Sequence, residues 1–152
     1  MGESNELVHA QLTQAASMGL TAILCVGEKE RDPSGAYFGV IEEQLSSAFK
    51  SAKKTEMLKI VIAYEPVWAI GKTAAEAMKP ADVREMSIFI KKTLADIFER
   101  KAALKVPILY GGSVESENAC ALITEGDVNG FLVGHASAAL NSFVEILKSC
   151  KK

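Results

Sequence analysis

The sequence predicts an α/β fold in which strands and helices alternate along the chain and the strands form a parallel sheet. Short apolar runs recur through the chain, and glycine or a polar residue closely follows each of them. Segments with apolar residues at helical spacing separate these runs. The runs show little polar–apolar alternation, which is typical of strands that lie buried between crossover helices.

The N-terminal part of the chain begins this alternation. Residues 6–18 carry apolar side chains at helical spacing and are followed by a glycine, a common end to a helix. Residues 21–26 form a continuous apolar strand. A loop at 31–35 leads to a second helix at about 38–53, and a second apolar strand covers residues 58–62.

The C-terminal part continues in the same way. A long helix is expected over residues 80–101, because its first residue is proline, which is favoured at that position. Residues 107–110 form a third strand, and a short helix follows at 115–123. Residues 128–133 form a fourth strand, and a closing helix covers 138–148. The chain thus contains a leading helix and four strand–helix units.

Composition and charge exclude several classes of protein. The chain has 152 residues, of which 49% are hydrophobic and 24% charged, so we expect residues 1–152 to form a single globular domain. A net charge of −2 gives no basis for binding nucleic acid or an anionic membrane. No apolar run is long enough to span a membrane, and the polar N-terminus is unlike a secretory signal. We therefore expect a cytoplasmic protein.

The cysteines and histidines indicate neither disulfides nor a metal site. Cys25, Cys120 and Cys150 lack CxxC spacing, so reduced thiols are the simplest interpretation. His9 and His135 lie far apart and have no ligand-like neighbours, so we expect no metal.

A single acid, Glu65, stands where the second strand ends. Pro66 follows at once, and an aromatic–apolar segment then leads to Gly71 and Lys72, a pattern typical of a hinged lid. The carboxyl ends of parallel strands are where α/β proteins place their chemistry. Glu65 is therefore a candidate general base that a closing loop would shield. A strand-end carboxylate that caps a neighbouring group is the alternative.

Two further strand ends carry glycines that suit an anion. Gly111, Gly112 and Ser113 stand between a strand and a helix, where backbone N–H groups, the hydroxyl and the helix N-terminus could converge on a phosphate. A plain tight turn is the alternative there. Gly134 and His135 follow the last strand in a similar way. We expect His135 to be a solvent-facing residue beside this anion site rather than a proton-transfer residue.

Four other residues have mainly structural interpretations. Cys25 lies within an apolar strand, which favours a small core residue over a nucleophile. Trp68 either anchors the lid or is simply a packed aromatic. Glu28 is expected to be a structural ion-pair partner, and Lys72 either closes a hinge or is solvated.

Several segments together resemble one enzyme family. AYEPVWAIGKT at residues 63–73 resembles the triosephosphate isomerase signature around the catalytic glutamate and its flexible loop. YGGSV at 110–114 and GFLVG at 130–134 are similar to the two phosphate-binding loops of that family. LCVGE at 24–28 and GES at 2–4 match further family segments in the same order. The resemblance covers essentially the whole chain.

The resemblance implies a TIM (βα)8 barrel, of which this chain would hold about four βα units and a leading helix. It also implies an enzyme of glycolysis and gluconeogenesis that interconverts dihydroxyacetone phosphate and D-glyceraldehyde 3-phosphate. Members of the family need no cofactor and are homodimers. Glu65 would move a proton between adjacent carbons of the triose phosphate through an enediol. The backbone around Gly71, Ser113 and Gly134, together with His135, would hold the substrate phosphate.

The same resemblance assigns a lid that excludes water from the intermediate. Besides Gly71, the residues of this lid are Pro66, Val67, Trp68, Ala69, Ile70, Lys72 and Thr73. The lid departs from the family pattern AIGTGKT, because this chain has AIGKT and carries an insertion at residues 74–79. His135 also replaces the usual second glycine of the last loop, although its backbone N–H remains.

The resemblance covers only the part of the family barrel from the helix before its fifth strand onward. The catalytic lysine, asparagine and electrophilic histidine of the family have no counterpart, and His9 is not that histidine by position. We therefore expect weak or no activity from the chain alone. Open strand edges near residues 21–26 and 130–133 predict pairing with a complementary N-terminal half or self-association, unless the chain belongs to a longer gene product. The alternative function is a non-catalytic phosphate-binding half-barrel, or assembly subunit.

Overall fold

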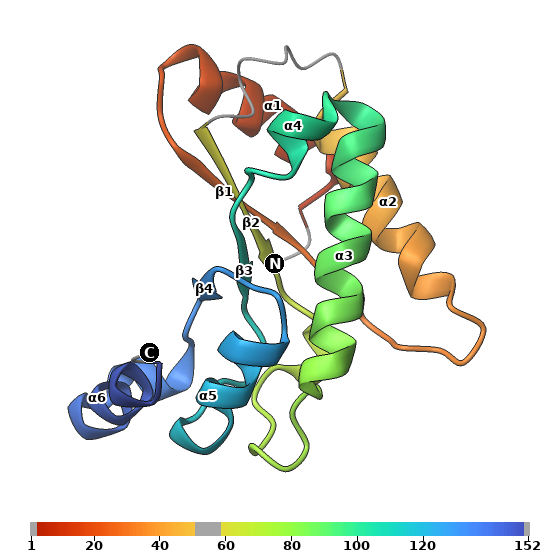
Figure 1. Ribbon diagram of the computed structural model, residues 1–152. Helices are drawn as coiled ribbons and strands as arrows, with labels where there is room; N and C mark the ends of the chain where they lie inside the picture. Colours follow the sequence, from red (N-terminus) through yellow and green to blue (C-terminus); the bar gives the residue numbers. More distant parts are fainter. Residues whose placement is uncertain (1–2, 51–58, 151–152) are drawn as a thin grey trace.

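The computed structural model describes residues 3–50 and 59–150 (Figure 1). The predicted end of the second helix at residue 53, residue 58 of the second strand and Gly2 lie outside the described residues. The elements are α1 (Asn5–Ser17), β1 (Ala22–Val26), α2 (Ala36–Ala48), β2 (Ile60–Tyr64), η2 (Val67–Ala69), α3 (Pro80–Ile97), α4 (Arg100–Ala103), β3 (Ile108–Tyr110), α5 (Ser116–Glu125), β4 (Gly130–Phe131), η3 (His135–Ala138) and α6 (Leu140–Ser149).

The four strands form a parallel sheet in the order β1-β2-β3-β4. The register pairs Ile23 with Val61 and Ala63 with Leu109. Each connection between neighbouring strands includes a helix, so all carboxyl ends of the strands lie along one edge of the sheet. The predicted α/β class with a parallel sheet is confirmed.

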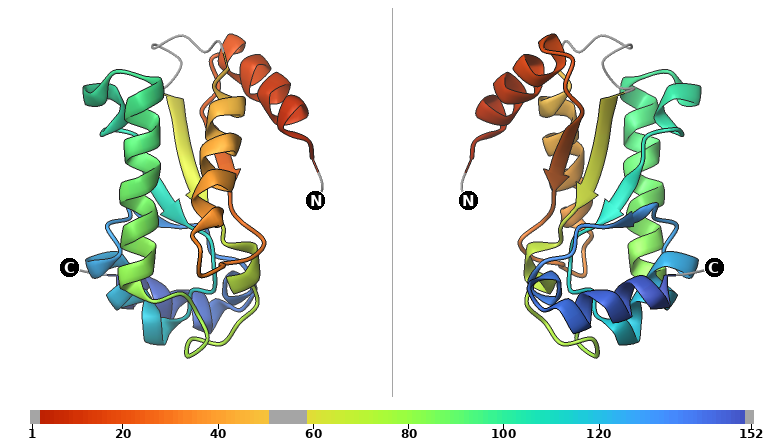
Figure 2. Two further views of the ribbon diagram at one scale, coloured as in Figure 1. Left: turned by 90° about the vertical axis from the view of Figure 1, so that its right-hand side faces the viewer. Right: turned by 90° about the vertical axis from the view of Figure 1, so that its left-hand side faces the viewer.

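Helices α2 and α3 cover one face of this sheet, as the two views of Figure 2 show. Apolar side chains of the strands and of these helices form one buried cluster there. Its members include Leu24, Val26, Ile60, Ile62, Tyr64, Ile108 and Tyr110 from the strands, and Ile41, Leu45, Val83, Met86, Ile90 and Leu94 from the helices. This cluster fixes the strands that carry the site.

The opposite face of β1 is open among the described residues (Figure 2). Ile23 is 52% exposed and Cys25 is also exposed, whereas the alternating Leu24 and Val26 are buried. The prediction that Cys25 is a core residue is therefore wrong. An apolar strand is typical of burial on both faces, but the described helices cover only one face of β1.

Two predicted elements differ in extent from the structure. The helix expected over 80–101 ends at Ile97, because Phe98 is extended, and α4 begins after it. The buried Phe98 ring packs edge-on against Phe49 at 5.1 Å, which anchors this break. The strand expected over 128–133 is paired only at Gly130–Phe131, because its neighbour β3 is itself short.

None of the helices in the described part of the chain has the length and apolar character needed to cross a bilayer. Within the same residues, no group of three or more histidine, cysteine, aspartate or glutamate side chains could hold a metal ion.

Candidate functional site

Glu65 lies directly after β2, at the edge where the strands end. Its N–H donates a hydrogen bond to the carbonyl of Val26 at 2.8 Å, so the β1–β2 pairing continues to this residue. Its side chain lies against Gly111 at the end of β3, where an added Cβ would stand 2.5 Å from the Glu65 Cγ. A Cβ on Gly27 would stand only 1.7 Å from the Glu65 carbonyl oxygen. Two glycines on neighbouring strand ends therefore make room for this one acid.

Cys25 is the titratable neighbour of Glu65. Partial burial, then a hydrogen bond to the Glu65 carboxylate and its negative charge, raise the pKa of the thiol to about 12. Cys25 is therefore a protonated thiol at neutral pH, which agrees with the prediction that it is not a nucleophile.

The segment predicted as a lid is tied down by Ser113. Residues 67–69 form the 3-10 turn η2, Ile70 is extended, and Gly71 has a positive φ of 71°. The Ser113 hydroxyl donates to the carbonyl of Ala69 at 2.9 Å and accepts from the N–H of Lys72 at 2.8 Å. This buried hydroxyl thus ties residues 69–72 to the turn after β3. We call residues 69–72 the strap. Sequence reasoning assigned Ser113 to the phosphate and missed its bonds to the lid.

The remaining lid residues are held by other contacts. Lys72 bonds through its backbone, and its exposed side chain fits the solvated interpretation. The N–H and hydroxyl of Thr73 donate to Glu76 at 3.3 and 2.8 Å, and Met78 is buried. The segment that is inserted relative to the family pattern is therefore folded against the molecule and carries its own anchors.

The four residues predicted for phosphate binding line one cavity of about 270 Å³. They are Gly71, Ser113, Gly134 and His135. Glu65 is not among its lining residues and instead lies beside it, against Gly111. The structure therefore brings the predicted base and the predicted anion site together along one edge of the sheet. His135 is exposed, as expected.

The start of α5 is less free to bind an anion than the sequence indicated. Glu115 caps this helix by accepting the N–H of Asn118, while the Asn118 side chain accepts the N–H of Glu115 at 2.9 Å. The same asparagine donates to the Ser113 carbonyl at 3.1 Å and so holds that turn in place. Because the Glu115 carboxylate caps this N-terminus, the helix end is already occupied by a negatively charged group of the chain itself.

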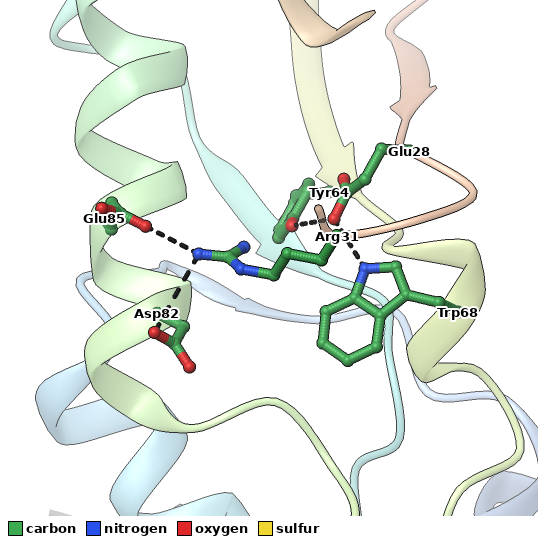
Figure 3. A network of polar contacts seen from close by, with 6 residues as sticks. All are labelled: Glu28, Arg31, Tyr64, Trp68, Asp82 and Glu85. Carbon is green, nitrogen blue, oxygen red and sulfur yellow. Dashed lines mark hydrogen bonds and ion pairs between the residues drawn. The ribbon is translucent and has the colours of Figure 1, made fainter. Parts of the chain in front are cut away.

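A buried carboxylate, Glu28, grips the other end of the lid (Figure 3). Its Oε1 accepts from Trp68 Nε1 at 2.7 Å and from the Tyr64 hydroxyl at 3.0 Å. Its carbonyl accepts the N–H of Val67 at 2.9 Å. Both side-chain donors that reach Oε1 are neutral, and the buried Oε2 has no hydrogen-bond partner among the described residues, so the predicted ion pair of Glu28 stays a prediction. The same contacts favour the interpretation of Trp68 as an anchor of the lid.

Comparison with known proteins identifies the family. The family model of triosephosphate isomerase matches residues 1–150. The chain belongs to the triosephosphate isomerase family. The resemblance of the motifs is thereby confirmed, and the four-stranded parallel sheet is consistent with part of a TIM barrel.

Relatives in the triosephosphate isomerase family are similar over nearly the whole chain. Triosephosphate isomerase of Dictyostelium discoideum is 43% identical over 148 residues, which are 97% of this chain and 56% of that protein. The enzyme of Chloroherpeton thalassium is 40% identical over 150 residues, 98% of this chain and 59% of the relative. The enzyme of Protochlamydia amoebophila is 37% identical over 146 residues, which are 95% of this chain and 54% of that protein. The chain thus spans slightly more than half the length of these relatives.

Proposed function

We propose that this chain supplies the base, the lid and the phosphate site of a triosephosphate isomerase. The observation that carries the proposal is the placement of Glu65 against Gly111, beside the cavity under the strap that Ser113 closes. A phosphate bound at Gly71, Ser113, Gly134 and His135 would present the rest of a triose to this carboxylate. Mere anion binding would need neither the acid nor the strap.

The proposed reaction interconverts dihydroxyacetone phosphate and D-glyceraldehyde 3-phosphate without a cofactor. The Glu65 carboxylate removes a proton from the carbon that bears the hydroxyl, and the electron pair moves toward the carbonyl oxygen to give an enediol(ate). The protonated Glu65 then returns the proton to the neighbouring carbon, while the hydroxyl proton passes from the first oxygen to the second, so that the carbonyl group has moved to the first carbon. The lid residues Pro66, Val67, Trp68, Ala69, Ile70, Lys72 and Thr73 would exclude water during this step.

The lysine, asparagine and histidine that serve the family have no counterpart in this sequence, so we propose that the group that polarises the substrate carbonyl comes from outside residues 1–152. Loss of each such group costs on the order of 10² to 10⁴ in rate. We propose that residues 1–152 form one domain of a cytoplasmic protein. We also propose that a partner supplies the complementary N-terminal strands and, with them, the missing group. Self-association of two copies is the competing arrangement, and the family's homodimer would be built on the completed barrel.

The test is isomerase turnover of the chain mixed with an N-terminal segment of a relative, for wild type and for Glu65→Gln. We expect the substitution to lower kcat by on the order of 10² to 10⁴, because it removes the base and retains the shape. Glu42→Gln is the matched control, since Glu42 is an exposed glutamate on α2. Equal turnover of the Glu65→Gln and Glu42→Gln mixtures would refute the proposed role.

The alternative, a phosphate-binding half-barrel without catalysis, predicts a different result. It requires affinity for a triose-phosphate analogue with no turnover in any mixture. The folded strap and the carboxylate beside the cavity favour the enzyme.

A further inference from the structure

One loop, residues 27–31, contacts the first end of the lid and also helix α3, which follows the lid in the chain. It holds the first end through Glu28, whose carbonyl binds the Val67 N–H at 2.9 Å and whose carboxylate binds Trp68 at 2.7 Å. Glu28 is only 1% exposed, so this grip is part of the packed interior. Any movement of the loop is therefore transmitted to the first turn of the lid.

Arg31, at the end of the same loop, reaches the element that follows the lid (Figure 3). Its Nη2 donates to Glu85 Oε2 at 2.6 Å and lies 4.0 Å from Asp82 Oδ1. Both acids stand in the first turns of α3, which begins at Pro80, after the inserted residues 74–79 that join the lid to this helix. Arg31 thus connects the loop that grips the start of the lid with the helix on which its end is mounted.

The setting of Arg31 differs from that of an ordinary surface ion pair. Its side chain is 18% exposed, whereas those of Asp82 and Glu85 are 46% and 50% exposed. The guanidinium also lies 4.4 Å over the centre of the Tyr37 ring on α2. Exposed pairs contribute little to stability because water and side-chain entropy oppose them, but a stacked and mostly buried arginine has one fixed position. It can therefore act as a strut.

We propose that Arg31 is a positioning residue that braces the two hinges of the lid against one another. The first hinge is at Val67 and Trp68, which Glu28 holds. The second hinge is the segment 74–79 before α3, and Arg31 holds that helix through Asp82 and Glu85. Without this strut the strap over the phosphate cavity would still form, but its two ends would move independently. The idea rests on the proposed function only in naming the lid, since the brace is a property of this chain by itself.

Trp68 is the only tryptophan in the sequence, so its emission reports the first hinge directly. In Arg31→Met, which retains the apolar stem, we expect red-shifted emission and faster quenching by acrylamide. Amide hydrogen exchange of residues 67–72 should rise about 5-fold or more, the lower end of a coupling between sites. Arg31→Lys should recover only part of this change, because lysine lacks the planar fork that stacks on Tyr37.

Two further variants separate the brace from general loss of folding. The double variant Asp82→Asn, Glu85→Gln should reproduce the Trp68 changes, although it alters neither the loop nor the lid. Arg84→Gln, an exposed arginine on the same helix, is the matched control and should leave them unchanged. Unchanged Trp68 emission and lid exchange in Arg31→Met, or the same change in Arg84→Gln, would overturn the proposal. These readouts need no turnover, so absent isomerase activity would count against the proposed function alone.

Discussion

Close packing around Glu65 defines the site at the scale of single residues. The side chain of Gly111 is a hydrogen, and the Glu65 Cγ occupies the space that a methyl group would take. The backbone of Glu65 approaches Gly27 more closely still. These contacts give Glu65 one place to lie, and a base is useful only if its position is fixed within a fraction of an ångström.

Gly111→Ala should therefore displace Glu65, the proposed base. The new Cβ would meet the Glu65 Cγ at 2.5 Å, and a misplacement of about 1 Å can cost on the order of 10² in rate. The measurement is kcat of the complemented enzyme. Gly39→Ala is the control, because a Cβ there meets nothing within 4 Å and alanine favours the helix α2. A Gly111→Ala enzyme as active as Gly39→Ala would contradict this packing argument.

The thiol beside Glu65 predicts a pH dependence. Cys25 keeps its proton up to about pH 12 when folded, above the value of 9.0 for an unperturbed thiol. Because the thiol ionises near pH 9 in the unfolded chain and only near pH 12 in the fold, its contribution to the free energy of unfolding is full below pH 9. This contribution is lost as the pH rises from 9 toward 12. Because only the thiolate reacts, iodoacetamide should modify Cys25 slowly at pH 8, with a rate rising about tenfold per pH unit.

Mass spectrometry of the alkylated chain checks this expectation, with the exposed Cys120 as an internal reference. Glu65→Gln should speed modification of Cys25, since it removes the carboxylate charge that opposes the thiolate. Equal rates for Cys25 and Cys120 at pH 8, unaffected by Glu65→Gln, would count against a Cys25–Glu65 contact.

At the scale of elements, parallel strands explain why distant residues meet. Glu65 follows β2, Ser113 follows β3 and His135 follows β4, and all three strands end along the same edge. The strap depends on this convergence, because a hydroxyl after β3 must reach a loop after β2. Ser113 therefore links two strand–helix units through its side chain.

Ser113→Ala should loosen the strap without changing the sheet. It removes hydrogen bonds to Ala69 and Lys72, each with a net contribution of about 1 kcal/mol, so exchange at the Lys72 amide should rise about 5- to 30-fold. Ser46→Ala on α2 is the control, because Ser46 is exposed. Retained protection of Lys72 in Ser113→Ala would argue against the strap.

Local patterns allowed most elements and the convergence of Glu65, Gly71, Ser113 and His135 to be predicted. Apolar runs locate strands, and parallel pairing follows from the helices between them. The break at Phe98 was missed, because it depends on packing against Phe49, far away in the chain. The contacts of Glu28 were missed for the same reason, since a carboxylate in a sequence does not show whether a cation or a neutral donor will face it.

The error at Cys25 belongs to the scale of the whole molecule. Its strand has the composition of one buried on both faces, yet Ile23 and Cys25 are exposed on the face opposite α2 and α3. The chain spans 54% to 59% of the length of the relatives compared above. An apolar sheet face without cover is costly in water, so we expect further strands to complete the sheet. Under the proposed function, these strands would also bring the group that polarises the carbonyl to Glu65.

The most direct test is isomerase turnover of the purified chain, measured alone and after addition of an N-terminal segment from a relative. We expect turnover of the chain alone to be lower than that of the mixture by on the order of 10² or more, because the chain contains the proposed base and the strap but no counterpart of the family's lysine, asparagine and histidine. Addition of the segment should restore activity, and Glu65→Gln should abolish that gain. Full turnover by the chain alone, or none in any mixture, would contradict the account.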